Sequence, residues 1–353
     1  MNGASEEGDR LAGAPHPRAA KCLIGHAEAE AAVLSAWSKG RLPHAFLIGG
    51  PQGIGKATLA YRIARFVLAS PHAGERKSIA PASLEIAPDH PVSRQVAALS
   101  HPDLLVLRRV KAEDDKKLPS EISVGEVRRT VPFFGSTAAL GGWRVCIVDS
   151  ADELNRNGAN ALLKVLEEPP ARSLILIVSH APGRLIATIR SRCRRLTLRP
   201  LSPADVARAL RAMTDEISDL PLSQIEEAAA ACGGRVRHAF ELLTGEGLEV
   251  RNLTADLLAR LPTVDGDALH SLGDRIQREQ GLAVFAETVE DWLAAAATGQ
   301  APAARLARLA ETWEKVRRAA VEADIYNLDR KPLVFQVFAM LAEATRQPSA
   351  GRA

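Results

Sequence analysis

The sequence predicts an α/β domain with a parallel sheet, followed by a region made of helices alone. Between Cys22 and Arg199, short apolar runs alternate with helical patterns, an order typical of parallel α/β sheets. A glycine-rich stretch lies between one of these runs and the helical pattern that follows it. From Asp205 to Gln347 the apolar runs stop and only helical periodicity remains.

Three apolar runs are expected to be strands: HAFLIGG, WRVCIVDS and SLILIVS. Each is unbroken, as in strands that are buried on both faces of a sheet. The segment KATLAYRIARFVLA is predicted to be a helix because apolar residues recur at helical spacing, at Leu59, Ile63, Phe66 and Val67. The segment NGANALLKVLEEPP is expected to be a helix that ends at Pro169 and Pro170.

These patterns predict three domains and two tails. Residues 1–20 are rich in Gly, Glu, Asp and Pro and lack an apolar stretch, so we expect a disordered tail there and no signal peptide. Residues 70–100 are weakly periodic and are expected to be a surface insertion. The expected order is an α/β domain at 21–200, a small helical lid at 201–247, a helical domain at 248–345 and a tail at 346–353.

The composition excludes several classes of function. The 353 residues include 45 Lys and Arg against 42 Asp and Glu, so the net charge of +3 creates no global field for nucleic acid or membranes. No apolar run reaches the ~18 residues that a membrane span requires. The four cysteines form no CxxC pair, which argues against zinc and favours a location in the reducing cytoplasm: Cys22, Cys146, Cys193 and Cys232.

The stretch IGGPQGIGKATL is similar to a phosphate-binding loop, whose pattern is G-x-x-x-x-G-K-[ST]. Backbone N–H groups of such a loop, and the helix N-terminus behind it, can hold a phosphate. The metal-binding hydroxyl is missing, because Ala57 follows the lysine and Thr58 lies about 100° further round the helix. The sequence therefore argues against Mg²⁺ binding at this loop but is compatible with phosphate binding. The residues concerned are Gly50, Gly53, Gly55, Lys56, Ala57 and Thr58. The alternative is a strand-to-helix turn without a ligand.

A second acidic strand end follows at VCIVDSADEL. Asp149 stands where a nucleotide-hydrolysing site places the carboxylate that holds the metal's water shell. The next residue, where a glutamate would polarise the attacking water, is Ser150, which has no basicity near neutral pH. Asp152 and Glu153 come later and are expected to point elsewhere. Two parts of a hydrolytic site are thus missing, although Asp149 could also be a simple turn former.

Six arginines cluster at the end of the α/β domain, at positions 184, 190, 192, 194, 195 and 199. Such a density of like charge predicts partners. An arginine can be lent across a subunit boundary to a neighbour's γ-phosphate, an effect worth roughly 10³ to 10⁵ in rate. The alternatives are a solvated basic face and a patch that binds the phosphate backbone of nucleic acid. The six arginines alone do not distinguish between these possibilities.

Four segments in this order give a family resemblance: GPQGIGKAT, VDSADELNRNGANALLKVLEEPP, VSHAPGRLIATIRSRC and GGRVRHAFELL. Together they resemble the clamp-loader ATPases of the AAA+ class, in which NALLKVLEEPP followed by SRC is a highly specific combination. The resemblance is close from Cys22 to Leu243 and looser beyond, although YNLDRKPLVFQVF near the end resembles the helical collar of that family. It implies an AAA+ P-loop domain, a small helical lid and a C-terminal helical collar.

The resemblance also implies roles for single residues. Arg192, in the triplet SRC, would be the arginine finger that acts in trans on ATP held by an adjacent motor subunit. Ser179 matches the sensor 1 position and Arg237 matches the sensor 2 arginine of the lid. The four-cysteine zinc module that many members carry after the phosphate-loop helix is not expected, because no cysteine lies between Cys22 and Cys146.

The implied partners are the other clamp-loader subunits, gamma/tau and delta, in a five-membered ring that acts on the sliding clamp and primed DNA, with no membrane. The leading hypothesis is a ring scaffold in the replisome that does not hydrolyse ATP, binds ATP or ADP weakly if at all, and donates Arg192. An ATP-hydrolysing motor subunit, in which Thr58 or a water replaces the missing hydroxyl, is the alternative. A lone nucleic-acid-binding protein is a third reading that the balanced net charge disfavours.

Overall fold

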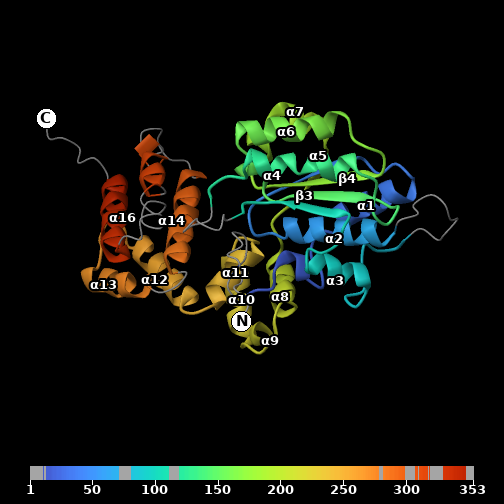
Figure 1. Cartoon of the computed structure of the whole chain (residues 1–353). Coiled ribbons are helices and arrows are strands. Elements are labelled where there is room, and N and C mark those ends of the chain that lie inside the picture. Colours follow the sequence, from blue (N-terminus) through green and yellow to red (C-terminus); the bar gives the residue numbers. More distant parts are fainter. Residues whose placement is uncertain are drawn as a thin grey trace. The chain divides into compact units, whose positions relative to one another are not determined.

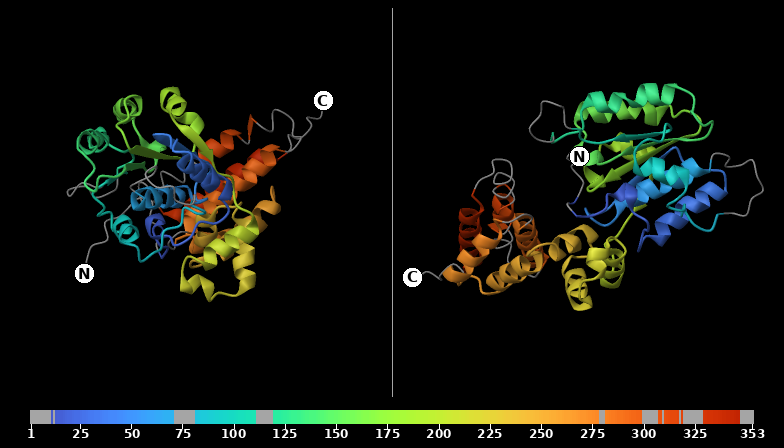
Figure 2. Two further views of the ribbon diagram at one scale, coloured as in Figure 1. Left: turned by 90° about the vertical axis from the view of Figure 1, so that its right-hand side faces the viewer. Right: turned by 60° about the horizontal axis from the view of Figure 1, so that its bottom comes forward.

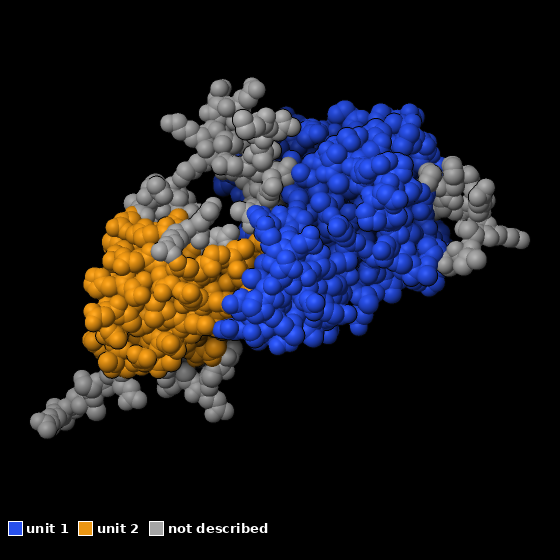
Figure 3. Space-filling view, turned by 90° about the horizontal axis from the view of Figure 1, so that it is seen from below, with its two compact units in different colours: residues 1–237 blue, residues 238–353 orange. Residues whose placement is uncertain are grey.

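The computed structural model describes residues 11, 13–70, 81–110, 119–277, 281–298, 307–308, 310–316, 318 and 329–346. The chain divides into two compact units, Met1–Arg237 and His238–Ala353 (Figure 3).

The first unit is built on a five-stranded sheet in which all neighbouring strands are parallel (Figure 1). Its order is β2-β3-β4-β1-β5, so the strand that leads into the glycine loop lies beside the last strand of the domain. The strands are β1 (Ala45–Gly49), β2 (Leu104–Leu107), β3 (Arg144–Val148), β4 (Ser173–Ser179) and β5 (Arg194–Thr197). The predicted α/β domain with a parallel sheet is confirmed, and β1, β3 and β4 are the three strands expected from the apolar runs.

Helices cover both faces of this sheet (Figures 1 and 2). One face packs on α2 (Lys56–Ala69), and the other packs on a layer that comprises α4 (Val124–Arg128), α5 (Thr130–Gly135), α6 (Arg156–Glu167) and α7 (Ala187–Arg192). Every residue of β1, β3 and β4 is buried, which is why these strands read as unbroken apolar runs. The remaining elements of this domain are η1 (Pro17–Ala19), α1 (Ala27–Ser38), α3 (Pro91–Ala97), η2 (Ala151–Glu153) and η3 (Pro182–Arg184).

Part of the expected tail at 1–20 is folded. Pro17–Ala19 forms η1, which packs against α2 and α3. Arg65 of α2 donates hydrogen bonds to the carbonyls of Arg18 and Ala20, at 3.0 and 3.1 Å, and Arg18 donates to the carbonyl of Ala97 at 2.9 Å. The prediction of disorder is therefore wrong for residues 17–20, because a buried arginine on a distant helix holds them. Residues 1–10 lie outside the described residues, as do 71–80 of the expected insertion and 347–353 of the expected final tail.

The expected lid comprises four helices, α8 (Pro203–Arg211), α9 (Asp215–Ser218), α10 (Leu222–Ala231) and α11 (Val236–Leu243). The connection from β5 is fixed by a hydrogen bond of 3.0 Å from Leu201 N–H to the carbonyl of Gly234. Gly234 has φ +77°, and a Cβ there would lie 2.5 Å from the carbonyl oxygen of Leu201. The boundary between the two compact units falls inside α11, so α8, α9 and α10 belong to the first unit.

The described part of the second unit contains only helices: α12 (Gly247–Ala259), α13 (Gly266–Arg275), α14 (Gly281–Thr298) and α16 (Arg330–Thr345). α12 packs on α14 and α13 packs on α16, and the rings of Phe285 and Phe338 lie 6.3 Å apart in their shared core. The helical region predicted after the sheet is thus confirmed, although residues 319–328, which include the start of YNLDRKPLVFQVF, lie outside the described residues. None of the described helices is long and apolar enough to cross a membrane.

Candidate functional site

The glycine loop connects β1 to α2 and contains three glycines with positive φ. Gly50, Gly53 and Gly55 have φ of +149°, +79° and +100°, values that residues with a side chain rarely adopt. A Cβ at Gly50 would lie 2.5 Å from the carbonyl oxygen of Leu198, so the close approach of β5 also demands a glycine there. Lys56 is the first residue of α2, whose N-terminus therefore opens onto the loop.

A cavity of about 250 Å³ adjoins the loop and the start of α2. Apolar residues from the N-terminal segment and from the expected lid close it, including Leu23, Leu201 and Met213. Seven of the predicted nucleotide-site residues line this cavity: Gly53, Gly55, Lys56, Ala57, Thr58, Asp149 and Arg237. The structure thus brings most of the predicted site together, whereas Gly50, Ser179 and Arg192 are not among the lining residues.

Lys56 lies deep in the loop, with only 3% of its surface exposed. Its ammonium group donates a hydrogen bond of 2.5 Å to the carbonyl of Pro51, inside the same loop. Burial lowers the pKa of Lys56 to about 8, against the opposing effect of the carboxylates of Asp152 and Asp149. An ammonium carries three donors, so the remaining two can still meet a phosphate while the group is protonated.

The Asp152 carboxylate is the centre of a hydrogen-bond network at the carboxyl ends of β3 and β4. One carboxylate oxygen accepts from the Ser179 hydroxyl at 2.9 Å and from the Ala181 N–H at 3.0 Å. The other accepts from the Ser150 hydroxyl at 3.0 Å and from the His180 N–H at 2.5 Å. Partial burial would raise the pKa of Asp152, but the donors from His180, Ser179, Ala181 and Ser150 outweigh it and hold that pKa below its usual value.

This network decides what the strand ends can do chemically. A carboxylate has about four lone-pair sites, and all four on Asp152 are used, so the group is a poor base and a poor metal ligand. The hydroxyl proton of Ser179, at the predicted sensor 1 position, is directed at Asp152. Ser150 is bound in the same way and is not a base. Asp152 does not point elsewhere, as the sequence suggested, but binds the end of β4.

Asp149 and Arg237 have different relations to the loop. Asp149 directly follows β3 and is buried, and its backbone N–H donates to the carbonyl of Leu107 at 2.9 Å. The backbone N–H of Arg237 donates to the carbonyl of Gly53 at 3.1 Å. A Cβ at Gly53 would lie 2.8 Å from the Cβ of Arg237. The start of α11 is therefore seated directly on the glycine loop, at the predicted sensor 2 residue.

Arg192 is the last residue of α7, which packs beside α6 at the outer layer of the α/β domain (Figure 1). Its guanidinium forms an ion pair of 2.9 Å with Glu167 of α6 and donates to the carbonyl of Thr188 at 3.1 Å. The Arg192 side chain is 35% exposed. A guanidinium has five N–H donors, so these two contacts leave donors for another group. Arg192 is held at the surface and away from the chain's own glycine loop.

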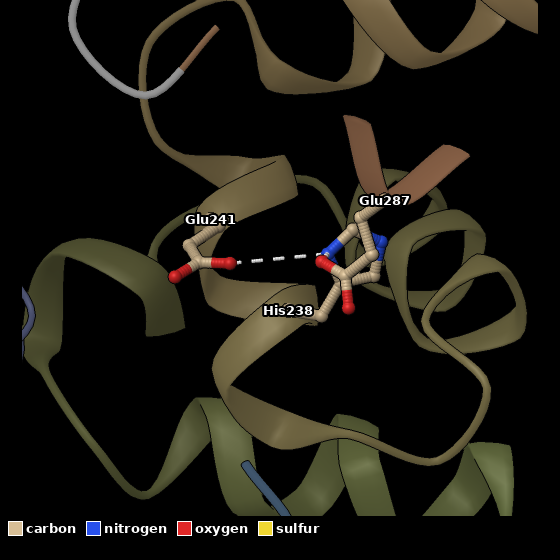
Figure 4. A group of neighbouring side chains, drawn as sticks. All are labelled: His238, Glu241 and Glu287. Carbon is tan, nitrogen blue, oxygen red and sulfur yellow. Dashed lines mark ion pairs between the residues drawn. The ribbon is translucent and has the colours of Figure 1, made fainter. Parts of the chain in front are cut away.

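One other group of described residues has the types and spacing to hold a metal ion, and it lies in the second unit (Figure 4). The candidate ligand atoms of His238, Glu241 and Glu287 lie within 4.8 Å of one another. His238 Nδ1 is paired with the carboxylate of Glu287 and lies 3.8 Å from that of Glu241. The contact with Glu287 joins α11 to α14, whereas His238 and Glu241 both lie on α11. The expectation that the chain binds no zinc remains a prediction.

A family model described as DNA polymerase III, delta subunit, matches residues 25–202, which is about half of the chain. The chain belongs to this family. Relatives named DNA polymerase III subunit delta-prime include the protein of Pseudomonas aeruginosa, 37% identical over 206 residues, which are 58% of this chain and 57% of that protein. The delta-prime subunit of Escherichia coli is 29% identical over 230 residues, or 64% of this chain and 62% of that protein. The family resemblance read from the motifs is thus confirmed.

The match spans about three fifths of the length of these delta-prime relatives. The tau subunit of DNA polymerase III from Escherichia coli is a more distant relative, 26% identical over 274 residues, which are 75% of this chain and 39% of that protein. Among solved structures, a DNA polymerase III gamma subunit-related protein and the RuvB Holliday junction branch migration motor, both from Thermotoga maritima, each give a TM-score of 0.44. They are 17% and 16% identical and cover 89% and 91% of this chain, and 100% and 91% of their own chains.

Two residues near the glycine loop were not predicted from the family sequence pattern. Asp152 organises the strand ends, and its partners Ser179, His180 and Ala181, at and just after the end of β4, lie 27 to 29 residues away in the sequence. His26 is buried, and its Nε2 lies 2.6 Å from the carbonyl oxygen of Ile54 in the glycine loop. The only signal in the sequence is that Asp152 and His26 each lie next to an apolar segment. The positions of these residues along the chain do not reveal contacts that form only after folding.

Proposed function

We propose that this chain is a delta-prime subunit of a DNA polymerase III clamp loader, and that it serves as a ring scaffold which does not hydrolyse ATP itself. In this role Arg192 stabilises the charge on the γ-phosphate of ATP held by a neighbouring ATPase subunit. The names of its relatives, subunits delta-prime and tau of DNA polymerase III, support this placement.

The observation that carries the proposal is the contrast between the two ends of the domain. At the strand ends, the hydroxyls of Ser150 and Ser179 are both bound to Asp152, and position 57 has no hydroxyl. At the outer layer, Arg192 is accessible and is positioned by Glu167. The first arrangement supports a site without a base, a metal hydroxyl or a free sensor, and the second supports an arginine that acts on another subunit.

The family match supports, as part of the same proposal, a finer assembly. The proposed partners are gamma/tau and delta subunits in a five-membered ring, to which the helices of the second unit would contribute a collar. Through that ring the chain would act on the sliding clamp and on primed DNA, as part of the replisome in the cytoplasm. The glycine loop would bind ATP or ADP weakly, with little help from Mg²⁺, because Ala57 offers no ligand.

The test is the ATPase rate of the reconstituted loader in which only this subunit carries Arg192→Ala. Hydrolysis at the one site that Arg192 completes is expected to fall by roughly 10³ or more, as for removal of an arginine finger, and the loader rate falls by the share of that site. Arg195→Ala is the matched control, because Arg195 is an exposed arginine of the same run on the neighbouring strand, and its rate should equal that of wild type. An unchanged rate in the Arg192→Ala loader would overturn the proposal.

A second candidate, a motor subunit that hydrolyses ATP, is favoured by one observation. Lys56, Thr58 and Asp149 line the same cavity, so a phosphate, a hydroxyl and a carboxylate could meet there. The isolated chain should then turn over ATP, and Lys56→Ala should abolish the turnover. If the isolated chain is inactive and a loader with Lys56→Ala in this subunit alone keeps its full rate, this second candidate is excluded.

A further inference from the structure

A second cavity, of about 140 Å³, lies on the side of α2 that is remote from its N-terminus. It is formed between η1, the later turns of α2, the segment before α3, and α3 itself. It shares Ala19, Ala20 and Lys21 with the cavity at the glycine loop, but none of the glycine-loop residues lines it, and the proposed function does not use it.

The lining of this cavity is strongly basic. It includes Arg18, Lys21, Arg62, Arg65 and Arg94, and none of the described residues that line it is acidic. Arg62 and Arg65 are each only 8% exposed and lie on one face of α2, three residues apart. Two buried guanidinium groups this close repel each other unless negative charge lies nearby.

The negative charge near these arginines is incomplete. Arg62 is paired with Glu30 at 2.6 Å and lies 3.6 Å from the carboxylate of Glu85. Arg65 instead donates to two neutral backbone carbonyls, those of Arg18 and Ala20. Burial, and then the charge of Arg62, lower the pKa of Arg65. Among the described residues that line the cavity, basic side chains therefore outnumber acidic ones, of which there are none.

One buried hydroxyl in the lining also lacks a partner. Ser93 of α3 is 5% exposed, and its Oγ makes no hydrogen bond to any residue that the structure describes. Buried hydroxyl groups in folded proteins nearly always have a hydrogen-bond partner. A hydroxyl beside guanidinium groups is a suitable donor to the oxygen of an anion.

We propose that this cavity is a binding site for a phosphate group, formed by Arg65, Arg94 and the Ser93 hydroxyl. A phosphate carries about −1.5 to −2 charges near neutral pH, which matches a surplus of several cations better than the single charge of a carboxylate does. A cavity of about 140 Å³ has room for one tetrahedral oxyanion together with water. The phosphate could be inorganic phosphate or the terminal 5′-phosphate of a DNA strand.

The test is calorimetric titration of the full-length chain with inorganic phosphate, against sodium chloride of equal ionic strength. Because the glycine loop could also bind phosphate, the titration is made in the Lys56→Ala background, where binding at this cavity should persist. Adding Arg94→Ala should weaken that binding roughly tenfold or more, and adding Ser93→Ala should weaken it several-fold. Arg94 is exposed, so its removal should leave the melting temperature unchanged.

Arg211→Ala is the matched control, because it removes an exposed arginine of α8 that does not line the cavity. Arg211→Ala should leave the dissociation constant for phosphate within about twofold of that of the Lys56→Ala protein. A second titration compares short single-stranded oligonucleotides with a 5′-phosphate and with a 5′-hydroxyl. A preference for the 5′-phosphate that Arg94→Ala removes identifies a DNA end, and binding of inorganic phosphate alone identifies the free ion. The proposal would be overturned if the chain showed neither phosphate binding nor a preference for the 5′-phosphate, or if Lys56→Ala alone abolished phosphate binding. Equal effects of Arg94→Ala and Arg211→Ala on phosphate binding would also overturn it.

Discussion

The guanidinium of Arg192 and the carboxylate of Glu167 form an ion pair of 2.9 Å that joins the ends of α7 and α6. Both residues belong to the segments that carry the family resemblance, Glu167 to NALLKVLEEPP and Arg192 to SRC. The contact gives a physical reason for these segments to occur together. The helix that ends at the two prolines supplies the carboxylate that positions the arginine.

Glu167→Gln should lower the ATPase rate of the reconstituted loader by about two- to fivefold. An exposed ion pair is worth roughly 0 to 1 kcal/mol, and its loss lets the Arg192 side chain sample other rotamers. The readout is the rate at low and at high salt. The difference from wild type should shrink at high salt, because salt screens the pair, whereas the effect of Arg192→Ala should persist. A rate equal to or above that of wild type at low salt would contradict a positioning role.

Asp152→Ala should destabilise the first unit by about 1 to 2 kcal/mol, since it leaves two hydroxyls and two N–H groups without their acceptor. The estimate is kept low because Asp152 is itself exposed to solvent. Chemical denaturation of both proteins measures the difference. Because the folded state lowers the pKa of Asp152, its stabilising effect is present above the usual aspartate pKa and is lost as the pH falls through the lowered one. The two proteins should therefore converge in acid, and a difference that stays constant with pH would refute the network's electrostatic role.

Nucleotide binding by the isolated chain should weaken as the pH rises from about 7 to about 9. The pKa of Lys56 is about 8, so its ammonium is charged below this pH and increasingly neutral above it. Titrations with ADP at several pH values give the dissociation constants. Lys56→Arg is the matched variant, because a guanidinium stays protonated across this range. Its affinity should not fall with pH, and equal slopes for the two proteins would exclude Lys56 as the cause.

Ala57→Ser should make nucleotide binding depend on Mg²⁺. The substitution restores a hydroxyl at the position where phosphate-binding loops hold the metal ion, on the first turn of α2. In wild type, ADP affinity in EDTA should lie within about twofold of that in Mg²⁺, and in Ala57→Ser the affinity in Mg²⁺ should exceed that in EDTA by roughly tenfold. ATP turnover should stay absent, since Ser150 is unchanged. Strong Mg²⁺ dependence in wild type would show that Thr58 or a water already serves as the ligand.

The sequence predicted the parts of the fold that have a strong local signature. β1, β3 and β4 are buried on both faces and are therefore unbroken apolar runs. β2 is only four residues long, and β5 begins with two arginines and is exposed at three of its four positions, so neither has that signature. The glycines and Lys56 were predicted from spacing, because a phosphate-binding loop is a local motif. The Asp152 network and the Arg192 pair join segments that are distant in the chain, and spacing alone does not contain such contacts.

If the chain does not hydrolyse ATP, as proposed, the saturated carboxylate of Asp152 also makes hydrolysis hard to restore by mutation. A glutamate at position 150 would restore a base, but it would remove one hydroxyl donor from Asp152 and bring a further negative charge beside Asp149 and Asp152. A hydroxyl at position 57 would restore a metal ligand, yet the proton of Ser179 would still be directed at Asp152. No single substitution returns all three groups, so a lineage that reaches this arrangement is expected to keep it.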